Sequence, residues 1–187
     1  MTTECATCGT AYGEPIAPIA SIFLLTAADR SHQALEYQLL RWLDDHWAKP
    51  SGRRVYQQIN VAGPGNWTEN YRIPDLVLLT TCRFQIDQNE YFDGGPDVVV
   101  ETHDPGDESY EKLDFYFKLG VREVWIIDRD SKHPEVFETA GDGFKPRWPN
   151  DDGWVQSHIA SCEIRIGPHD KLEIREIGCV EAAAELP

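Results

Sequence analysis

Residues 96–128, PDVVVETHDPGDESYEKLDFYFKLGVREVWIID, decide the fold class. Two runs rich in Val and Ile, Asp97 to His103 and Val121 to Asp128, have the composition of strands buried on both faces of a sheet. Between them, apolar residues recur at helical spacing from Asp107 to Leu119, and Gly120 stands where a helix-ending glycine is expected. The order strand, helix, strand predicts a parallel β-α-β unit.

The flanking segments extend this unit into an α/β domain with a central mixed sheet. Helical spacing of leucines predicts a helix from Ser31 to about Pro50, with Asp29 or Ser31 as its cap. Short strands are expected at residues 54–61 and 74–82, and antiparallel strands separated by Gly, Pro and Asp turns are expected up to about residue 177. We therefore expect an N-terminal helix and one crossover helix on the faces of the sheet.

Composition limits the class of protein. The chain has 187 residues, 41% hydrophobic and 26% charged, which predicts one folded domain over residues 30–187 preceded by an N-terminal arm of residues 1–29. The longest apolar run, residues 17–28, is too short to cross a bilayer, and the N-terminus lacks the basic start of a secretory signal. These features predict a cytoplasmic protein with reduced thiols, in which the pair Cys5 and Cys8 is incidental.

The charge balance narrows the possible interactions with nucleic acid. The formal net charge is −15, from 17 basic and 32 acidic residues, so passive coating of DNA by a basic surface is excluded. Carboxylates that hold divalent metal ions are the exception, because the ion then becomes the largest local positive charge. An acidic protein with such a site can act on a polyanion.

Three ionisable residues mark this site in the middle of the chain. Asp75 opens an apolar strand after Pro74, and Glu101 lies on the strand that begins at Asp97, on the same face as His103. Two carboxylates on neighbouring buried strands repel each other unless a cation lies between them, and Mg²⁺ accepts such oxygen ligands. Lys112, on the following helix, can bring its ammonium toward the same place.

At these residues the chain resembles the Uma-type endonuclease family, formerly a domain of unknown function, which belongs to the PD-(D/E)xK nuclease superfamily. The resemblance covers about residues 31–140 and is carried by Pro74-Asp75, by Glu101 after a valine run, and by the blocks PGDESYEKL (105–113) and GVREVWIID (120–128). It implies a restriction-endonuclease-like fold and a nuclease activity that depends on Mg²⁺ or Mn²⁺.

The resemblance also implies roles for individual residues. Asp75 and Glu101 become metal ligands, the carbonyl oxygen of Thr102 adds a further ligand, and Lys112 replaces the strand lysine of the superfamily, because His103 stands at that position. Three alternatives follow from this departure: Lys112 supplies the missing ammonium, His103 acts as the base, or the site is catalytically weakened. An ammonium stays charged near neutral pH, which favours Lys112.

Two residues of the first helix are further candidates. His32 resembles a family position, and Glu36, one turn later, can lean toward the site as an additional acid.

We therefore expect hydrolysis of phosphodiester bonds in nucleic acid, with DNA as the substrate and a homodimer as the form that cuts both strands of a duplex. The alternative is a degenerate nuclease fold kept as a binding or interaction module, which the acidic charge and His103 favour.

Overall fold

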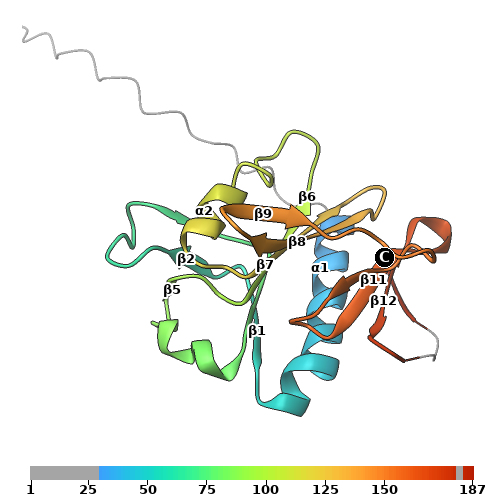
Figure 1. The fold of residues 1–187 in the computed structure, drawn as a ribbon, viewed down its shortest axis with the longest axis horizontal. Coiled ribbons are helices and arrows are strands. Elements are labelled where there is room, and N and C mark those ends of the chain that lie inside the picture. Colours follow the sequence, from blue (N-terminus) through green and yellow to red (C-terminus); the bar gives the residue numbers. More distant parts are fainter. Residues whose placement is uncertain (1–29, 180–182) are drawn as a thin grey trace, which may run out of the picture.

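The computed structural model describes residues 30–179 and 183–187, so the predicted N-terminal arm with Cys5 and Cys8 lies outside the described residues. A six-stranded mixed sheet with the order β1-β4-β6-β7-β8-β9 forms the centre of the molecule (Figure 1). It is accompanied by a four-stranded sheet, β10-β11-β12-β13, and a three-stranded sheet, β3-β2-β5.

The elements have the following bounds: α1 (Arg30–Leu43), η1 (Asp44–Ala48), η2 (Lys49–Ser51), β1 (Arg54–Gln57), β2 (Asn60–Ala62), β3 (Tyr71–Arg72), β4 (Leu76–Leu79), η3 (Thr81–Ile86), β5 (Tyr91–Asp93), β6 (Val98–His103), α2 (Leu113–Lys118), β7 (Glu123–Asp128), β8 (Pro134–Ala140), β9 (Gly143–Pro146), β10 (Val155–Ser157), β11 (Cys162–Ile166), η4 (Pro168–Asp170), β12 (Leu172–Glu176) and β13 (Ala184–Leu186). None of the helices in these described segments is long and apolar enough to span a membrane.

Strands β6 and β7 form the predicted parallel pair at the centre of the sheet. Their ladder runs from Val98 opposite Glu123 to His103 opposite Asp128, with α2 in the connection. The neighbouring pairs β4–β6 and β7–β8 are antiparallel. The predictions of a β-α-β unit and of a mixed sheet are therefore confirmed, as is the prediction of antiparallel strands after β7.

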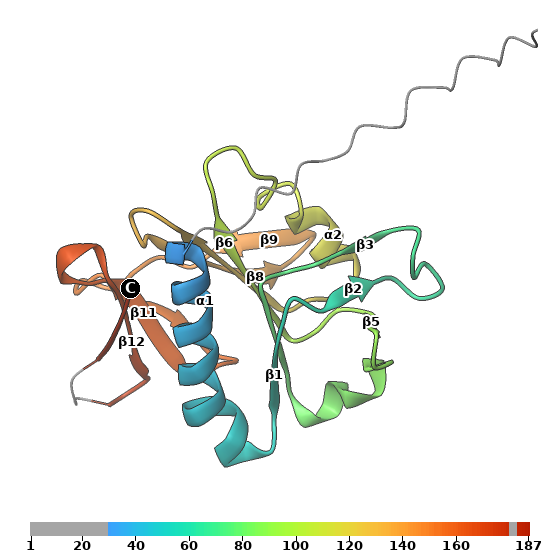
Figure 2. The ribbon, with the colours of Figure 1, turned by 180° about the vertical axis from the view of Figure 1, so that it is seen from behind.

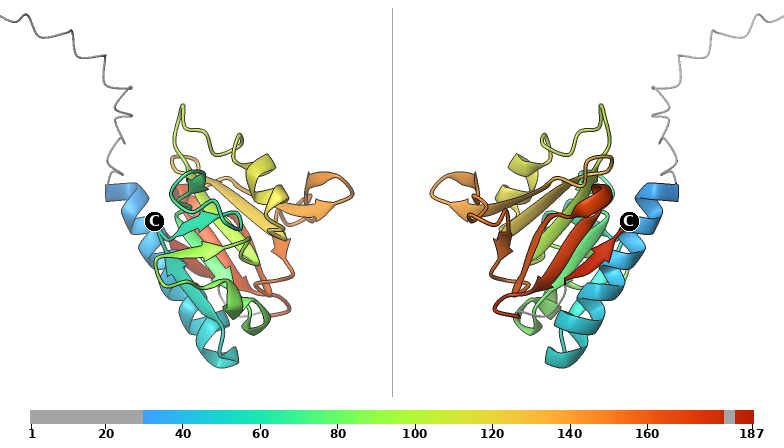
Figure 3. Two further views of the ribbon diagram at one scale, coloured as in Figure 1. Left: turned by 90° about the vertical axis from the view of Figure 1, so that its left-hand side faces the viewer. Right: turned by 90° about the vertical axis from the view of Figure 1, so that its right-hand side faces the viewer.

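The central sheet is covered on both faces, which explains its unbroken apolar strands. Alternate residues of β4 and β6 divide between two clusters: Leu76 and Val98 pack with α1 and the four-stranded sheet, whereas Val77 and Val99 pack with α2 and the three-stranded sheet. Figures 2 and 3 show α1 and α2 on opposite sides of the central sheet.

The helix predicted for residues 107–119 is shorter in the structure, where α2 covers only Leu113–Lys118. The Asp107 carboxylate accepts hydrogen bonds from the backbone N–H groups of Asp104 and Ser109 and from the Ser109 hydroxyl. These local bonds hold the preceding segment in turns, since an Asp side chain that binds nearby N–H groups competes with helix formation.

Two predicted strands also end early. The run 54–61 is divided into β1 and β2 at Gln58, whose φ of 51° is incompatible with a continuous strand. The run 74–82 stops at Leu79, because the N–H and hydroxyl of Thr80 both donate to Oδ2 of Asp97, at 2.7 and 2.8 Å, and η3 follows.

Candidate metal centre and active site

Asp75 and Glu101 lie opposite each other at one end of the central sheet. In the antiparallel ladder of β4 and β6, Leu76 is paired with Val100, so Asp75 and Glu101 are next in register. Oδ2 of Asp75 accepts a hydrogen bond of 2.6 Å from the backbone N–H of Thr102. This bond fixes the Asp75 carboxylate against β6.

Glu101 is buried, with 2% of its surface exposed, and both of its oxygens are engaged. Nζ of Lys112 donates to Oε2 at 2.8 Å, and the hydroxyl of Tyr116 donates to Oε1 at 2.5 Å. Burial, together with the Asp75 carboxylate, raises the pKa of Glu101 to about 7 against the opposing effects of Lys112 and Tyr116. The structure thus brings Lys112 and Glu101 together and makes the carboxylate sensitive to a nearby cation.

Tyr116 supports this arrangement from α2. Its burial and the neighbouring Glu101 carboxylate raise the pKa of the phenol well above its ordinary value, so the hydroxyl stays protonated and donates to Glu101. In the sequence, Tyr116 follows Lys112 at the i+4 position, which places both residues on the same side of a helix. Its hydrogen bond fixes the orientation of the Glu101 carboxylate.

A second group of potential ligands shares Asp75. One ligand atom each from His32, Glu36 and Asp75 lies within 4.8 Å of the others. Nε2 of His32 contacts Oε1 of Glu36 and lies 3.6 Å from Oδ1 of Asp75. These carboxylates, Asp75 first, raise the pKa of His32 to about 10, so the imidazole is cationic at neutral pH.

The donor set of this group fits a divalent metal ion. Glu36 is 1% exposed, and its Oε1 lies against Nε2 of His32. Its other oxygen accepts from Nε2 of Gln57 at 2.9 Å. The carboxylate oxygens of Glu36 and Asp75 suit Mg²⁺ or Mn²⁺, and His32 can join them as a nitrogen ligand only after it loses its proton to become neutral. Glu101 does not join this three-residue group, although its pKa responds to Asp75.

The predicted site residues His103 and Thr102 do not contact Glu101 through the hydrogen bonds that Lys112 and Tyr116 make. His103 contacts Asp107 and Tyr110, and Thr102 contacts Asp75. Nδ1 of His103 is 2.7 Å from Oδ1 of Asp107, and the ring meets Tyr110 edge on at 5.2 Å. Thr102 contributes its N–H to Asp75. A ligand role for the Thr102 carbonyl oxygen and a base role for His103 stay predictions.

Sequence reasoning missed two residues at this end of the sheet. Oδ1 of Asp104 lies 3.6 Å from Nδ1 of His32 and 3.1 Å from Nη1 of Arg129. Asp104 and Arg129 each follow directly after one of the parallel strands β6 and β7. Since the carboxyl ends of parallel strands meet at one edge, this position was a signal available in the sequence.

The basic residue Arg83 lies away from the candidate site. It donates to the carbonyl oxygens of Gly95 and Gly120 and lies 3.9 Å from Asp97, just before β6 begins. Glu101 is four residues along the strand from Asp97, a distance of about 13 Å. Arg83 therefore stabilises the opposite end of the sheet.

The comparisons with known proteins agree with this architecture. The model of the Uma2 family, described as "Putative restriction endonuclease", matches residues 21–161. The chain belongs to the Uma2 family. The matched range is longer at both ends than residues 31–140, over which the sequence resemblance was noted. The restriction-endonuclease-like fold expected of the family is the fold observed.

A solved structure resembles this Uma2 chain. It is the crystal structure of a protein from Anabaena variabilis ATCC 29413 that is described as "a putative nuclease belonging to DUF820". The two share 16% sequence identity with a TM-score of 0.55, over 71% of this chain and 74% of the other, which shows a common fold. No curated protein gave a significant match.

Proposed function

We propose that this Uma2 chain hydrolyses phosphodiester bonds of nucleic acid, with DNA as the substrate, in a reaction that depends on Mg²⁺ or Mn²⁺. The observation that carries the proposal is the gathering of Asp75, Glu101 and Lys112 with His32 and Glu36 at one end of the sheet. Family membership supplies the nuclease class.

Asp75 and Glu101, with the carbonyl oxygen of Thr102, are the ligands we assign to the ion. Glu36 is a further acid beside Asp75, and the burial of its carboxylate supports that role. When bound, the ion supplies Lewis-acid chemistry that activates water and neutralises charge on the phosphate. It also offsets the repulsion between carboxylates that raises the pKa of Glu101.

Lys112 is the residue we assign to the reacting groups. Its side chain is 22% exposed, so the ammonium can meet a substrate while it contacts Glu101. A fixed cation there orients the attacking water and stabilises the charge that develops as the bond from water to phosphorus forms and the bond to the leaving oxygen breaks. Tyr116 is a positioning residue, because it acts through Glu101.

The test is cleavage of duplex and single-stranded substrates with Mg²⁺ and with Mn²⁺. Asp75→Asn and Glu101→Gln should each abolish cleavage. Glu123→Gln is the matched control, because Glu123 is also a buried glutamate of the central sheet but bonds Trp125 and Ser157 instead. Activity that survives both site substitutions points to a contaminating nuclease and contradicts the proposal.

A binding module is the second candidate, favoured by the net charge of −15 and by His103 at the lysine position. It predicts that the wild type binds nucleic acid without cutting it under any metal condition. The expected homodimer and cytoplasmic location stay predictions, which sedimentation velocity and localisation of the tagged chain would test.

A further inference from the structure

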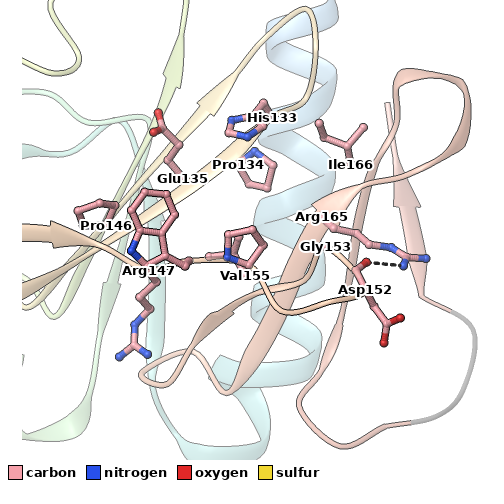
Figure 4. Close-up of a pocket in the computed structure, with 12 residues that line it drawn as sticks. His133, Pro134, Glu135, Pro146, Arg147, Asp152, Gly153, Val155, Arg165 and Ile166 are labelled. Carbon is pink, nitrogen blue, oxygen red and sulfur yellow. Dashed lines mark hydrogen bonds between the residues drawn. The ribbon is translucent and has the colours of Figure 1, made fainter.

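A cavity of about 450 Å³ lies beside the junction of the central and four-stranded sheets (Figure 4). Its walls are largely apolar and include Pro134, Pro146, Trp148, Val155 and Ile166. This volume is in the range of cavities that bind small organic groups. None of these residues has a role in the candidate metal centre.

Trp148 is the most exposed large apolar residue described, with 82% of its surface in solvent. It stands between Arg147 and Pro149, in a segment whose backbone is anchored by the 2.7 Å hydrogen bond from Arg147 N–H to the Val136 carbonyl oxygen. The Glu138 carboxylate forms an ion pair with the Arg147 guanidinium and holds this side chain as well. An exposed indole on an anchored segment is typical of a surface that stacks on a ligand, because little conformational freedom remains to be lost.

Part of the cavity lining, at His133 and Pro134, lies at the same end of the sheet as the candidate active site. Tyr110 connects the two: its ring contacts His103, and its hydroxyl donates to Glu135, which lines the cavity. His103 on β6 and Pro134 on β8 are two strands apart, which corresponds to about 10 Å. One strand of nucleic acid advances by about 3.4 Å for each stacked nucleotide, so about three nucleotides span this interval.

The charges around the cavity favour an uncharged occupant. Arg147 and Arg165 line it, but their guanidinium groups are paired with Glu138 and Glu173. The acidic lining residues Glu135 and Asp152 disfavour a phosphate inside the cavity. A planar, uncharged base can enter between the apolar walls while its phosphates stay outside, and base–aromatic stacking tolerates any sequence.

We propose that this cavity binds a base of the substrate strand, about three nucleotides from the phosphate that is cut, by stacking on Trp148. The inference rests on the proposed function for its substrate. A base that enters the cavity has left its stack, so the preferred substrate is single-stranded or unpaired at that position.

The first test measures binding apart from cleavage, using the wild-type chain with Ca²⁺ in place of Mg²⁺, so that the carboxylates stay neutralised, and oligodeoxythymidylate as the probe. The Trp148 fluorescence, obtained as the difference between the wild type and Trp148→Phe, should be quenched on binding. Trp148→Ala should weaken binding about tenfold or more, and Trp148→Phe should restore most of the affinity. Tyr37→Ala removes another exposed aromatic ring, on α1, and should leave affinity unchanged.

The second test places a single abasic site at successive positions along the oligonucleotide. Loss of affinity should be greatest at one position, and this penalty should disappear in Trp148→Ala. Equal affinity of the wild type and Trp148→Ala for the oligonucleotide would overturn the inference. A proline-rich peptide is the competing occupant of an apolar cavity, so quenching of the Trp148 fluorescence by such a peptide but not by the oligonucleotide would also overturn it. Because binding is measured apart from cleavage, cleavage that depends on Asp75 together with unchanged binding by Trp148→Ala would refute this inference and leave the proposed function standing.

Discussion

Nζ of Lys112 lies 2.8 Å from Oε2 of Glu101, although Lys112 is eleven residues further along the chain and outside the strand of Glu101. The superfamily pattern expects a lysine two residues after Glu101, where this chain has His103. The side chains of Glu101 and His103 leave β6 on one face. Lys112 approaches that face from the start of α2, so an ammonium reaches the carboxylate from a different element.

This relationship predicts a specific effect of Lys112→Ala. Turnover should fall by about a hundredfold or more, because a charge that stabilises the transition state is lost. The affinity for Mg²⁺ should fall far less, since Lys112 is not a ligand. Single-turnover kinetics and calorimetry separate the two effects, and a parallel loss of metal affinity would argue that Lys112 only maintains the ligand geometry.

His103→Ala is the companion variant and should have the smaller effect on turnover. The imidazole is 2.7 Å from the Asp107 carboxylate, which also binds the turn before α2. We expect a modest loss of thermal stability and a reduction of less than tenfold in turnover. A loss as large as that of Lys112→Ala would identify His103 as the base.

Metal binding should depend on Asp75 more than on either neighbouring glutamate. Asp75 belongs to the group with His32 and Glu36 and also perturbs Glu101. In calorimetric titrations with Mg²⁺ and Mn²⁺, Asp75→Asn should abolish binding, whereas Glu36→Gln and Glu101→Gln should each weaken it. Glu123→Gln should bind like the wild type, and full binding by Asp75→Asn would exclude this centre.

Glu123 provides a prediction for the pH dependence of stability. Its burial raises the pKa of the carboxyl, so the folded chain holds the proton more tightly than the unfolded chain. Stability from this group is complete below the ordinary value of 4.5 and is lost as the pH rises through the folded pKa. For each pKa unit by which the folded value exceeds the unfolded one, this group contributes about 1.4 kcal/mol to the free energy of unfolding at low pH.

Glu123→Gln should therefore lose less stability than the wild type between pH 4 and pH 8, measured by urea denaturation. The glutamine oxygen can still accept the 2.7 Å hydrogen bond from the Trp125 indole. If the free energy of unfolding changes by the same amount between pH 4 and pH 8 in Glu123→Gln and in the wild type, other groups cause the pH dependence of stability.

Gly95 should be intolerant of any side chain. A Cβ at this position would lie 2.6 Å from the Leu119 carbonyl oxygen and 2.7 Å from the Val121 nitrogen, both backbone atoms. Gly95→Ala should cost about 2 kcal/mol or more, because the backbone must move. Gly143→Ala is the matched control, since a Cβ there has no neighbour within 4 Å. Equal thermal midpoints for the two variants would contradict this packing.

The sequence by itself determined the centre of the fold. The valine and isoleucine runs that became β6 and β7 are long enough, and apolar enough, to require burial on both faces, and their connection is too long for a hairpin. Asp75 and Glu101 could be recognised because strand register follows from local alternation and from the proline before Asp75. The pairing of β4 with β6, which places the two carboxylates opposite each other, is a long-range property of the sheet.

Only the tertiary structure decided which residues complete the site. His32 and Glu36 lie on α1, and their approach to Asp75 depends on how α1 packs on the sheet, which periodicity does not specify. The cavity at Trp148 likewise exists because two sheets meet, since no local pattern distinguishes this tryptophan from the five others of the chain. Periodicity reports which face of an element is buried, whereas the distance between elements is set by the packing of side chains far apart in the sequence.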